Sequence, residues 1–474
     1  MNPCDFTDRH TIRLFRIAAL CSYGIGYLYI KNLWDGPDWT SGILFFTILF
    51  ILCTECFAFA AGRTPAKLRA AGISSWEGIF FAVCALVQAA AMYGYGLHMD
   101  MGAAQVFMWH TTMVVYVLTR TGMQVSGRIG PLFLLDFLQG FFALPFGNIH
   151  LRIVSIFRGV RKETGTDSTS APALPAPQDG TVPALPEAAP APLPKGRYSR
   201  SEKCLIAVGV LFGILLTAVV WSELTGVSSA FAGLDFGIAK ALRSFYEIYL
   251  SDFFDDFIPK FLFSIPVGAW LFGLVGGSLR RSRPVFTEAE FENASRPWHA
   301  FPVITLYIVS GMLAAVYALF FAVSIRELLG LVNITAPAAS KLAVNGFWQL
   351  VRIVMINIAT LGVYSLFLKG SETNAAGSET GWSGVPRVFL TVQFAFTTAF
   401  ALLAGWKLFG IYIGLFGPTP RRMLSGWFLL VLLLACVLIL VRLYKKTAAA
   451  RIVLLAAAAS FSVLCCLPVA RICP

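Results

Sequence analysis

The sequence has little charge for its length. Of its 474 residues, 13% are Asp, Glu, Lys or Arg, whereas 57% are hydrophobic, and the mean hydropathy is +0.72. Soluble globular domains are about 25% charged and about half apolar. A soluble fold could not bury this much apolar surface, so the composition excludes a soluble protein and indicates a membrane protein.

Clusters of cysteine or histidine are also lacking. Most of the ten cysteines lie within or beside apolar runs, where a free cysteine behaves as a small apolar residue. The stretch "CTEC" at 53–56 has CxxC spacing, but it lacks a second pair of ligands and a nearby histidine. We therefore expect no disulfide framework, no metal site and no cofactor.

Catalytic motifs are missing too. The sequence contains no P-loop, HExxH or GxSxG motif, and no GxGxxG motif in a strand-turn-helix context. No combination of residues provides an acid, a base and a nucleophile that would converge. An enzyme acting on a lipid-linked substrate is therefore the least favoured of the functional alternatives.

What the sequence does contain is a series of long apolar runs, such as "FIPKFLFSIPVGAWLFGLVGG" at 257–277. About 20 apolar residues in a helix cross the roughly 30 Å hydrocarbon layer of a bilayer. Runs of this kind predict an all-α fold with eleven transmembrane helices, at 14–30, 43–61, 79–95, 103–118, 205–221, 257–279, 301–323, 347–368, 388–409, 424–441 and 452–469.

The net charge of +12 would suggest a nucleic-acid partner in a soluble protein, but the basic residues here lie in alternate loops between the runs. Lys and Arg gather in cytoplasmic loops of membrane proteins. Placing these loops in the cytoplasm puts the N-terminus inside and the C-terminus outside, and makes nucleic-acid binding improbable. The loops hold Arg63, Lys67 and Arg69, then Arg120, Arg128 and Arg152, then Lys195 to Lys203, and finally Arg280, Arg281 and Arg283.

The tract at 171–195 is rich in Pro and Ala and predicts an extended cytoplasmic linker. It divides the chain into an N-terminal membrane region (1–157), a linker (158–203) and a C-terminal membrane domain (204–474). The apolar segment 136–148 has basic clusters on both sides, which predicts an interfacial or re-entrant segment. The periodicity of 231–249 predicts an amphipathic helix on the outer surface.

Three stretches of the C-terminal half resemble a bacterial membrane family known as domain of unknown function 4173, with its 4153 relatives. They are "PKFLFSIPVGAWLFGLVGG" at 259–277, "NGFWQLVRIVMIN" at 345–357 and "IYIGLFGPTPRR" at 411–422. The resemblance covers roughly residues 204–460. It implies a polytopic protein of the bacterial cytoplasmic (inner) membrane with no established activity. Matching positions are Pro266, Val267, Gly268, Phe272, Gly273, Gly346, Phe347, Asn357, Tyr412, Gly417, Thr419 and Arg422.

Ionisable residues at membrane depth are candidate functional residues, because each costs about 2.5–3.5 kcal/mol at the centre of a helix. Glu55 is the most deeply placed carboxylate, and is either a proton or cation site or a hydrogen-bonding residue of the bundle. Arg352 lies near the start of its run, where it can extend toward the interface. His110 is expected to bond to a neighbouring helix.

Two further features suggest sites. Pro266 and Gly268 predict a helix break that would free carbonyl groups near mid-span. In "GPTPRR", Thr419 is a suitable helix cap, and Arg421 and Arg422 follow it, while Lys407 lies near the end of the preceding run, beside the same loop. These cations predict either an anion site or contacts with lipid headgroups. The eleven-helix topology places them outside, although their charge favours the inside.

Three functions remain open on these grounds. The first is transport or translocation of a small or anionic solute or of a lipid, for which the expected helix break is the motive. The second is a regulatory or assembly role, with the tract at 171–195 as the contact with a protein partner. The third is the membrane enzyme already mentioned. Membrane lipids are the expected partners in each case.

Overall fold

The computed structural model describes residues 9–34, 39–98, 100–157, 252–330, 336–368 and 384–467. These residues are almost all helical, and within these ranges there is no β-strand, apart from an isolated bridge between Phe301 and Leu368. The expected all-α fold is confirmed for this part of the chain. The tract at 171–195, the expected span at 205–221 and the amphipathic segment at 231–249 lie outside these ranges.

The N-terminal helices alternate in direction, as short loops between long apolar helices require. The core of this group lies around α5, which buries nearly all of its second half and packs against α2 and α4. It ends at Gly122, whose left-handed φ of 72° suits glycine at a helix C-terminus. The helices are α1 (Arg9–Trp34), α2 (Trp39–Ala60), α3 (Pro65–Ala70), α4 (Ser75–Tyr95) and α5 (Gly102–Thr121).

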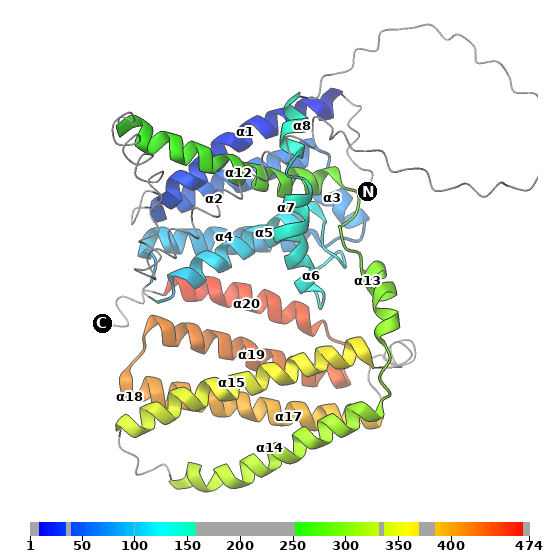
Figure 1. Ribbon diagram of the computed structural model, residues 1–474, viewed down its shortest axis with the longest axis vertical. Helices are drawn as coiled ribbons and strands as arrows, with labels where there is room; N and C mark the ends of the chain where they lie inside the picture. Colours follow the sequence, from blue (N-terminus) through cyan, green and yellow to red (C-terminus); the bar gives the residue numbers. More distant parts are fainter. Residues whose placement is uncertain are drawn as a thin grey trace, which may run out of the picture. The chain divides into compact units, whose positions relative to one another are not determined.

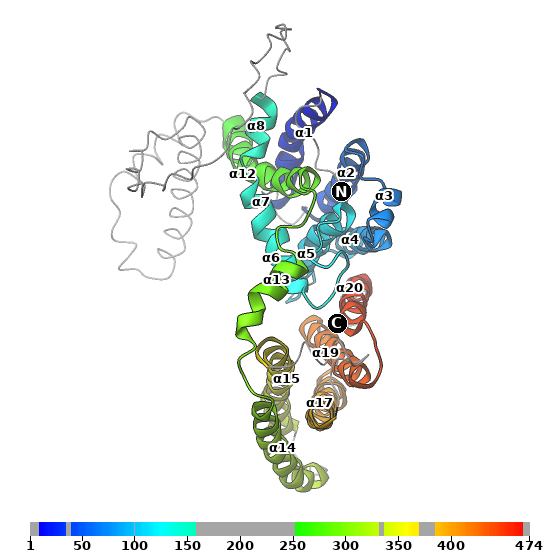
Figure 2. The same ribbon diagram turned by 90° about the vertical axis from the view of Figure 1, so that its right-hand side faces the viewer.

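The segment expected to be interfacial or re-entrant forms a chain of short helices. These are α6 (Phe133–Leu138), the π-helix η2 (Gln139–Ala143), α7 (Leu144–Gly147) and α8 (Leu151–Phe157). In both views they run across the neighbouring long helices instead of alongside them (Figures 1 and 2). The length and composition of 133–157 would allow it to cross a membrane, so the interfacial or re-entrant segment stays a prediction.

The long helix α12 (Asp252–Arg280) packs with the N-terminal helices, and residues such as Phe272, Leu274 and Leu279 join their hydrophobic core. We refer to α1 to α8 and α12 together as the first bundle. Two short elements, α13 (Glu288–Ser295) and η3 (Arg296–Trp298), then lead away from it. Helix α13 begins with a capping box in which Thr287 and Glu290 bond to each other's backbone amides.

A second bundle has its own core, in which Tyr317, Phe347, Phe400 and Leu408 are buried. The last helix, α20, packs on α4 of the first bundle and on α19 of the second, and lies between them in both views (Figures 1 and 2). The second bundle comprises α14 (Ile304–Gly330), α15 (Ala336–Phe367), α17 (Val385–Gly405), η5 (Trp406–Ile413), α18 (Gly414–Phe416) and α19 (Pro420–Tyr444), and α20 (Ala449–Cys466) follows it.

These contacts do not follow the division of the chain at the linker. The described residues before 158 and after 259 belong to one compact unit. Helices on both sides of the linker in sequence therefore share one core.

Nine segments in the described part of the chain are long and apolar enough to cross a membrane, so the structure indicates a multi-pass membrane protein. All but Phe133–Phe157 coincide with expected runs. The expected runs at 14–30 and 103–118 are helical, as parts of α1 and α5, but contain more polar residues. The count of eleven remains a prediction, because one expected span lies outside the described residues.

Many basic residues of the sequence fall at helix ends or in loops that lie at one end of the helices, and this end is on the right in Figure 1. We call it the basic end. It includes the ends of α2, α5, α12 and α19 and the starts of α17 and α20. The opposite end carries fewer cations, among them Lys31, Lys407, Arg421 and Arg422. At the basic end lie Arg63, Lys67, Arg69, Arg120, Arg128, Arg280, Arg281, Arg283, Arg387, Arg442, Lys445, Lys446 and Arg451.

Candidate functional site

A partly open cavity of about 240 Å³ lies in the first bundle, among α1, α2, α5, η2 and α12. Its wall is almost entirely apolar and aromatic, and no lining side chain carries a formal charge. Cavities between helices are common places for ligands in helical bundles. The lining residues are Tyr29, Phe46, Phe50, Trp109, His110, Met113, Val114, Phe141, Val267, Trp270, Leu271 and Leu274.

The most polar pair in this wall joins α1 to α5. Tyr29 Oη lies 2.6 Å from His110 Nε2, and His110 Nδ1 lies 2.8 Å from the carbonyl oxygen of Val106. A carbonyl oxygen only accepts, so the ring hydrogen is on Nδ1 and Tyr29 donates to Nε2. The expectation that His110 bonds to a neighbouring helix is confirmed.

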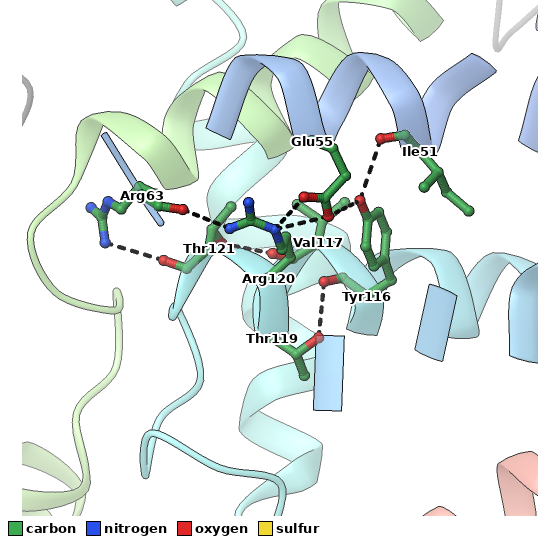
Figure 3. Close-up of polar contacts among 8 residues, drawn as sticks. All are labelled: Ile51, Glu55, Arg63, Tyr116, Val117, Thr119, Arg120 and Thr121. Atoms are coloured by element: carbon green, nitrogen blue, oxygen red, sulfur yellow. Dashed lines mark hydrogen bonds and ion pairs between the residues drawn. The ribbon is translucent and has the colours of Figure 1, made fainter. Parts of the chain in front are cut away.

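Glu55, the deepest carboxylate in the sequence analysis, is an ion-pair partner (Figure 3). Its two carboxylate oxygens lie 2.8 Å and 2.7 Å from Arg120 Nε, and Tyr116 donates to it at 2.9 Å. Arg120 also donates to the carbonyl of Arg63 at 2.8 Å. Arg63 in turn donates to the carbonyls of Thr121 and Arg281. The cluster therefore links α2, α5 and the end of α12 at the basic end.

A second charged cluster, which the sequence analysis missed, surrounds Glu77 at the start of α4. Its side chain is fully buried, and Oε1 lies 2.7 Å from Arg451 Nη2 of α20. Its other oxygen accepts from Gln124 Nε2 at 2.9 Å and from the amide of Ile129 at 3.1 Å. Arg451 lies 374 positions further along the chain, and no local pattern links it to Glu77.

The loop after α5 is held by neighbouring polar groups. Asp136 accepts from the amide of Val125 at 2.7 Å, and Gln139 donates to the carbonyl of Met123. Gln139 Oε1 accepts from the amide of Val285, which follows α12. These bonds fix the loop and the start of the transverse helices at the basic end.

The second bundle contains a network of uncharged polar side chains, which we call the neutral network. Asn357 is fully buried, accepts from Gln393 at 2.9 Å and donates to Tyr317 Oη at 2.9 Å. Ser310 donates to Gln393 Oε1 at 2.8 Å and lies 3.1 Å from Tyr364 Oη. The neutral network connects α14, α15 and α17, and hydrogen bonds of this kind hold membrane helices together.

The cations proposed for an anion site do not converge in the described structure. Arg352 and Arg421 are exposed. Arg422 donates to the carbonyls of Phe416 and Gly417 at 2.8 Å and 2.6 Å, and its guanidinium lies 4.1 Å from the centre of the Tyr412 ring. Lys407 lies against Gly346, where an added Cβ would be 2.5 Å from its Nζ.

The expected helix break at Pro266 and Gly268 does not occur, since α12 is helical from Asp252 to Arg280. Gly268 instead permits a close approach to α1. An added Cβ would lie 2.7 Å from the carbonyl oxygen of Ser22, and one on Gly26 would lie 2.8 Å from that of Ser264. Helices in membranes use small residues in this way.

Arg152 was assigned to a cytoplasmic loop from the sequence, but it is only 2% exposed. Its Nη1 donates to the carbonyl of Ile265 at 2.7 Å, and its guanidinium lies 3.3 Å from the centre of the Tyr23 ring. It connects α8 to α1 and α12 where Gly268 brings these helices together. A basic residue counted as a loop charge thus belongs to the interior.

Several residues that carry the family resemblance have a role in how the helices end or pack. Thr419 caps α19 by accepting from the amide of Arg422, and Gly417 has a φ of 72°. Gly273 packs so closely that an added Cβ would lie 2.5 Å from the carbonyl oxygen of Pro145. Asn357 is the centre of the neutral network. These four residues cap a helix, allow a turn or a close crossing, and join helices through hydrogen bonds.

The chain matches the family described as Domain of unknown function (DUF4153) over residues 78–473. The match covers most of the chain, so the protein belongs to this family. It reaches much further toward the N-terminus than the resemblance found in the sequence. Membership of the related 4173 group remains a prediction. Neither the curated proteins nor the solved structures contain a significant match.

Proposed function

We propose that this member of the DUF4153 family is a multi-pass protein of the bacterial cytoplasmic membrane that translocates a lipid. The cavity in the first bundle carries this proposal. With α12 continuous, the helix break that first suggested transport offers no support, and the proposal depends on the cavity instead.

The chemistry of the cavity wall favours a lipid over a small anionic solute. An anion buried in protein needs a cation or several hydrogen-bond donors around it. The wall has no charged side chain, and aromatic residues such as Phe46, Phe50 and Trp270 make up much of it. Hydrocarbon, by contrast, gains free energy from contact with such a wall.

The cations at the opposite end support only a minor role for an anion. Arg422 already donates to two carbonyls, and Arg352 and Arg421 are exposed. Exposed arginines at a membrane interface bind lipid phosphates without a built site. We therefore assign Lys407, Arg421 and Arg422 to contacts with headgroups.

The distribution of charge supports an orientation in which the basic end faces the cytoplasm. Helix α1 begins at that end (Figure 1), so the N-terminus would be cytoplasmic. Single cysteines at Ser282 and Pro418, in a background without other exposed cysteines, test this orientation. An impermeant maleimide added to intact cells should label Pro418→Cys and spare Ser282→Cys. The reverse pattern would refute the orientation.

Translocation is tested with purified protein in liposomes that contain a phospholipid with a fluorescent headgroup. Dithionite quenches the outer leaflet, which holds about half of the probe. The protein should make the inner half accessible within minutes, whereas protein-free liposomes should keep it protected. Leu271→Trp, which fills the cavity, should lose this activity. Leu262→Trp, on the exposed face of the same helix, should keep it. Equal protection with and without protein would refute the proposal.

The regulatory or assembly role and the membrane enzyme have no structural feature in their favour comparable to the cavity. The tract at 171–195, the expected contact with a protein partner, lies outside the described residues, and that partner stays a prediction. The ionisable side chains described above take part in ion pairs or hydrogen bonds, or are individually exposed. No observation favours the enzyme over translocation.

A further inference from the structure

We infer that the cavity of the first bundle takes up a segment of a lipid's hydrocarbon chain, and that it rejects groups that need a hydrogen-bond donor from the protein. This inference rests on the proposed function and specifies which part of the lipid enters the cavity. It follows from the size of the cavity and from the state of each polar side chain in its wall.

The size suits a chain segment. An apolar cavity of about 150 Å³ is large enough to bind benzene. By the same proportion, the 240 Å³ cavity holds an apolar segment of roughly ten carbon atoms. A whole lipid would not fit, so the headgroup and the rest of the chain would remain outside the cavity.

The hydrogen-bond donors of Tyr29 and His110 are already used. Tyr29 donates to His110 Nε2 at 2.6 Å, and His110 Nδ1 donates to the carbonyl of Val106 at 2.8 Å. The pair therefore has no hydrogen left to offer a ligand. Tyr29 Oη retains lone pairs, so it can still accept a hydrogen bond.

The two tryptophans of the wall are in the same state. Trp109 Nε1 donates to Thr47 Oγ1 at 3.1 Å, and Trp270 Nε1 donates to the carbonyl of Phe141 at 3.2 Å. Among the lining residues no other side chain has an N–H or O–H group. Every side-chain donor in this wall is thus committed to the protein itself.

A ligand's carbonyl oxygen would consequently be buried without a partner, which lowers affinity. This argues against a ketone, an ester or a quinone ring inside the cavity. A hydrocarbon chain has no polar group to satisfy. An alcohol brings its own hydrogen and can donate it to Tyr29 Oη. The wall therefore accepts alkyl chains and alcohols and disfavours carbonyl compounds of equal length.

The test uses decanol with a diazirine at the end of its chain and the purified full-length protein in detergent. After photolysis, mass spectrometry of peptides should find saturable labelling at cavity residues such as Phe50, Met113 and Leu271. Unlabelled 1-decanol should compete fully. 2-Decanone should compete about tenfold less well, because its oxygen finds no donor.

Variants of α12 provide the matched control. Val267→Trp places an indole in the cavity and should reduce the saturable labelling about fivefold or more, because close-packed interiors leave no room for both. Leu262→Trp adds the same indole on the exposed face and should leave the labelling unchanged. Leu271→Phe gives a milder filling if Val267→Trp does not fold, as judged by gel filtration.

Each result supports or overturns one statement. Labelling that does not saturate, or that survives both filling substitutions, overturns chain binding in the cavity. Equal competition by the ketone and the alcohol overturns the argument from committed donors. Saturable labelling in a protein that leaves the inner leaflet protected would keep this inference and refute translocation. Lipid movement without saturable labelling would support translocation and refute chain binding in the cavity.

Discussion

The two bundles use different polar chemistry inside a similarly apolar fold. The first bundle contains charged side chains: the half-exposed Glu55 pairs with the buried Arg120, the buried Glu77 pairs with Arg451 of α20, and Arg152 is buried. The second bundle buries neutral amides and hydroxyls, centred on Asn357 and Gln393. Among the ion pairs of the described residues, the one between Glu77 and Arg451, which joins the first bundle to α20, has a fully buried carboxylate.

The difference has an energetic meaning. Removing one partner of a buried ion pair leaves a charge without compensation and costs about 3–5 kcal/mol. Hydrogen bonds between membrane helices contribute about 0.6 kcal/mol on average and at most about 1.7 kcal/mol. The first bundle should therefore be sensitive to single substitutions, and the second should tolerate them.

The position of the charges adds a functional distinction. Both ion pairs lie at the basic end, and the uncharged cavity lies deeper, among α1, α2, α5, η2 and α12. Neither ion pair contributes a charge to the cavity wall, whose polar side chains are neutral and bonded within the protein. A hydrocarbon chain can enter such a region without meeting a charge.

The largest expected effect is that of Glu77→Ala. It leaves Arg451, Gln124 and the amide of Ile129 without their shared acceptor, and Glu77 is fully buried. We expect the free energy of unfolding in detergent to fall by about 3–5 kcal/mol, or the protein to fail to accumulate. Glu292→Ala, on the exposed surface of α13, should have no such effect. Equal stability of both variants would refute the contrast between the bundles.

Close packing of α1 on α12 gives the next largest effect. Gly26→Ala would place a Cβ 2.8 Å from the carbonyl oxygen of Ser264 and must separate the two helices. We expect a loss of about 1–3 kcal/mol in the free energy of unfolding. Gly24, two positions earlier, has open space around it, and Gly24→Ala should be neutral or slightly stabilising. Thermal unfolding of both variants measures the difference, and a loss in Gly24→Ala alone would contradict it.

The fold class and most helices could be predicted because each apolar run contains enough information to define one helix. The basic clusters beside segment 136–148 set it apart from the spans, but its division into the short helices α6, η2, α7 and α8 depends on packing that composition does not show. The continuity of α12 through Pro266 depends on neighbouring helices, which the local sequence does not show. Arg120 and Arg152 were placed in loops for the same reason.

The candidate site was predictable only in fragments. His110 and Glu55 were noticed because polar residues are rare in apolar runs, but their partners Tyr29 and Arg120 lie 81 and 65 positions away. The cavity has no signature in sequence at all. It arises where residues from five separate elements leave space between them, and that depends on how the helices cross.

The neutral network should be less sensitive than either feature of the first bundle. Asn357→Leu removes bonds to Tyr317 and Gln393 but leaves no charge behind. We expect the free energy of unfolding to fall by about 1–2 kcal/mol. Met355→Leu, on the exposed side of α15, is the matched control. A loss as large as that of Glu77→Ala would show that charge is not what distinguishes the bundles.

The smallest effect is expected at the exposed edge of the first bundle. Glu55→Gln keeps an oxygen that can accept from Arg120 and Tyr116 but removes the charge, and the Glu55 side chain is 42% exposed. Partly exposed pairs contribute about 0–1 kcal/mol. Arg120→Gln should cost more, because Arg120 is buried and also holds the carbonyl of Arg63.

Thermal unfolding of the two single variants and the double variant gives the coupling between Glu55 and Arg120, expected to be about 1 kcal/mol. Lipid translocation should be unchanged in Glu55→Gln, because Glu55 does not line the cavity. A Glu55→Gln variant of normal stability that no longer translocates lipid would instead make this carboxylate a functional group. The charges of the first bundle would then serve transport as well as stability, and the separation between the charged basic end and the apolar cavity would no longer hold.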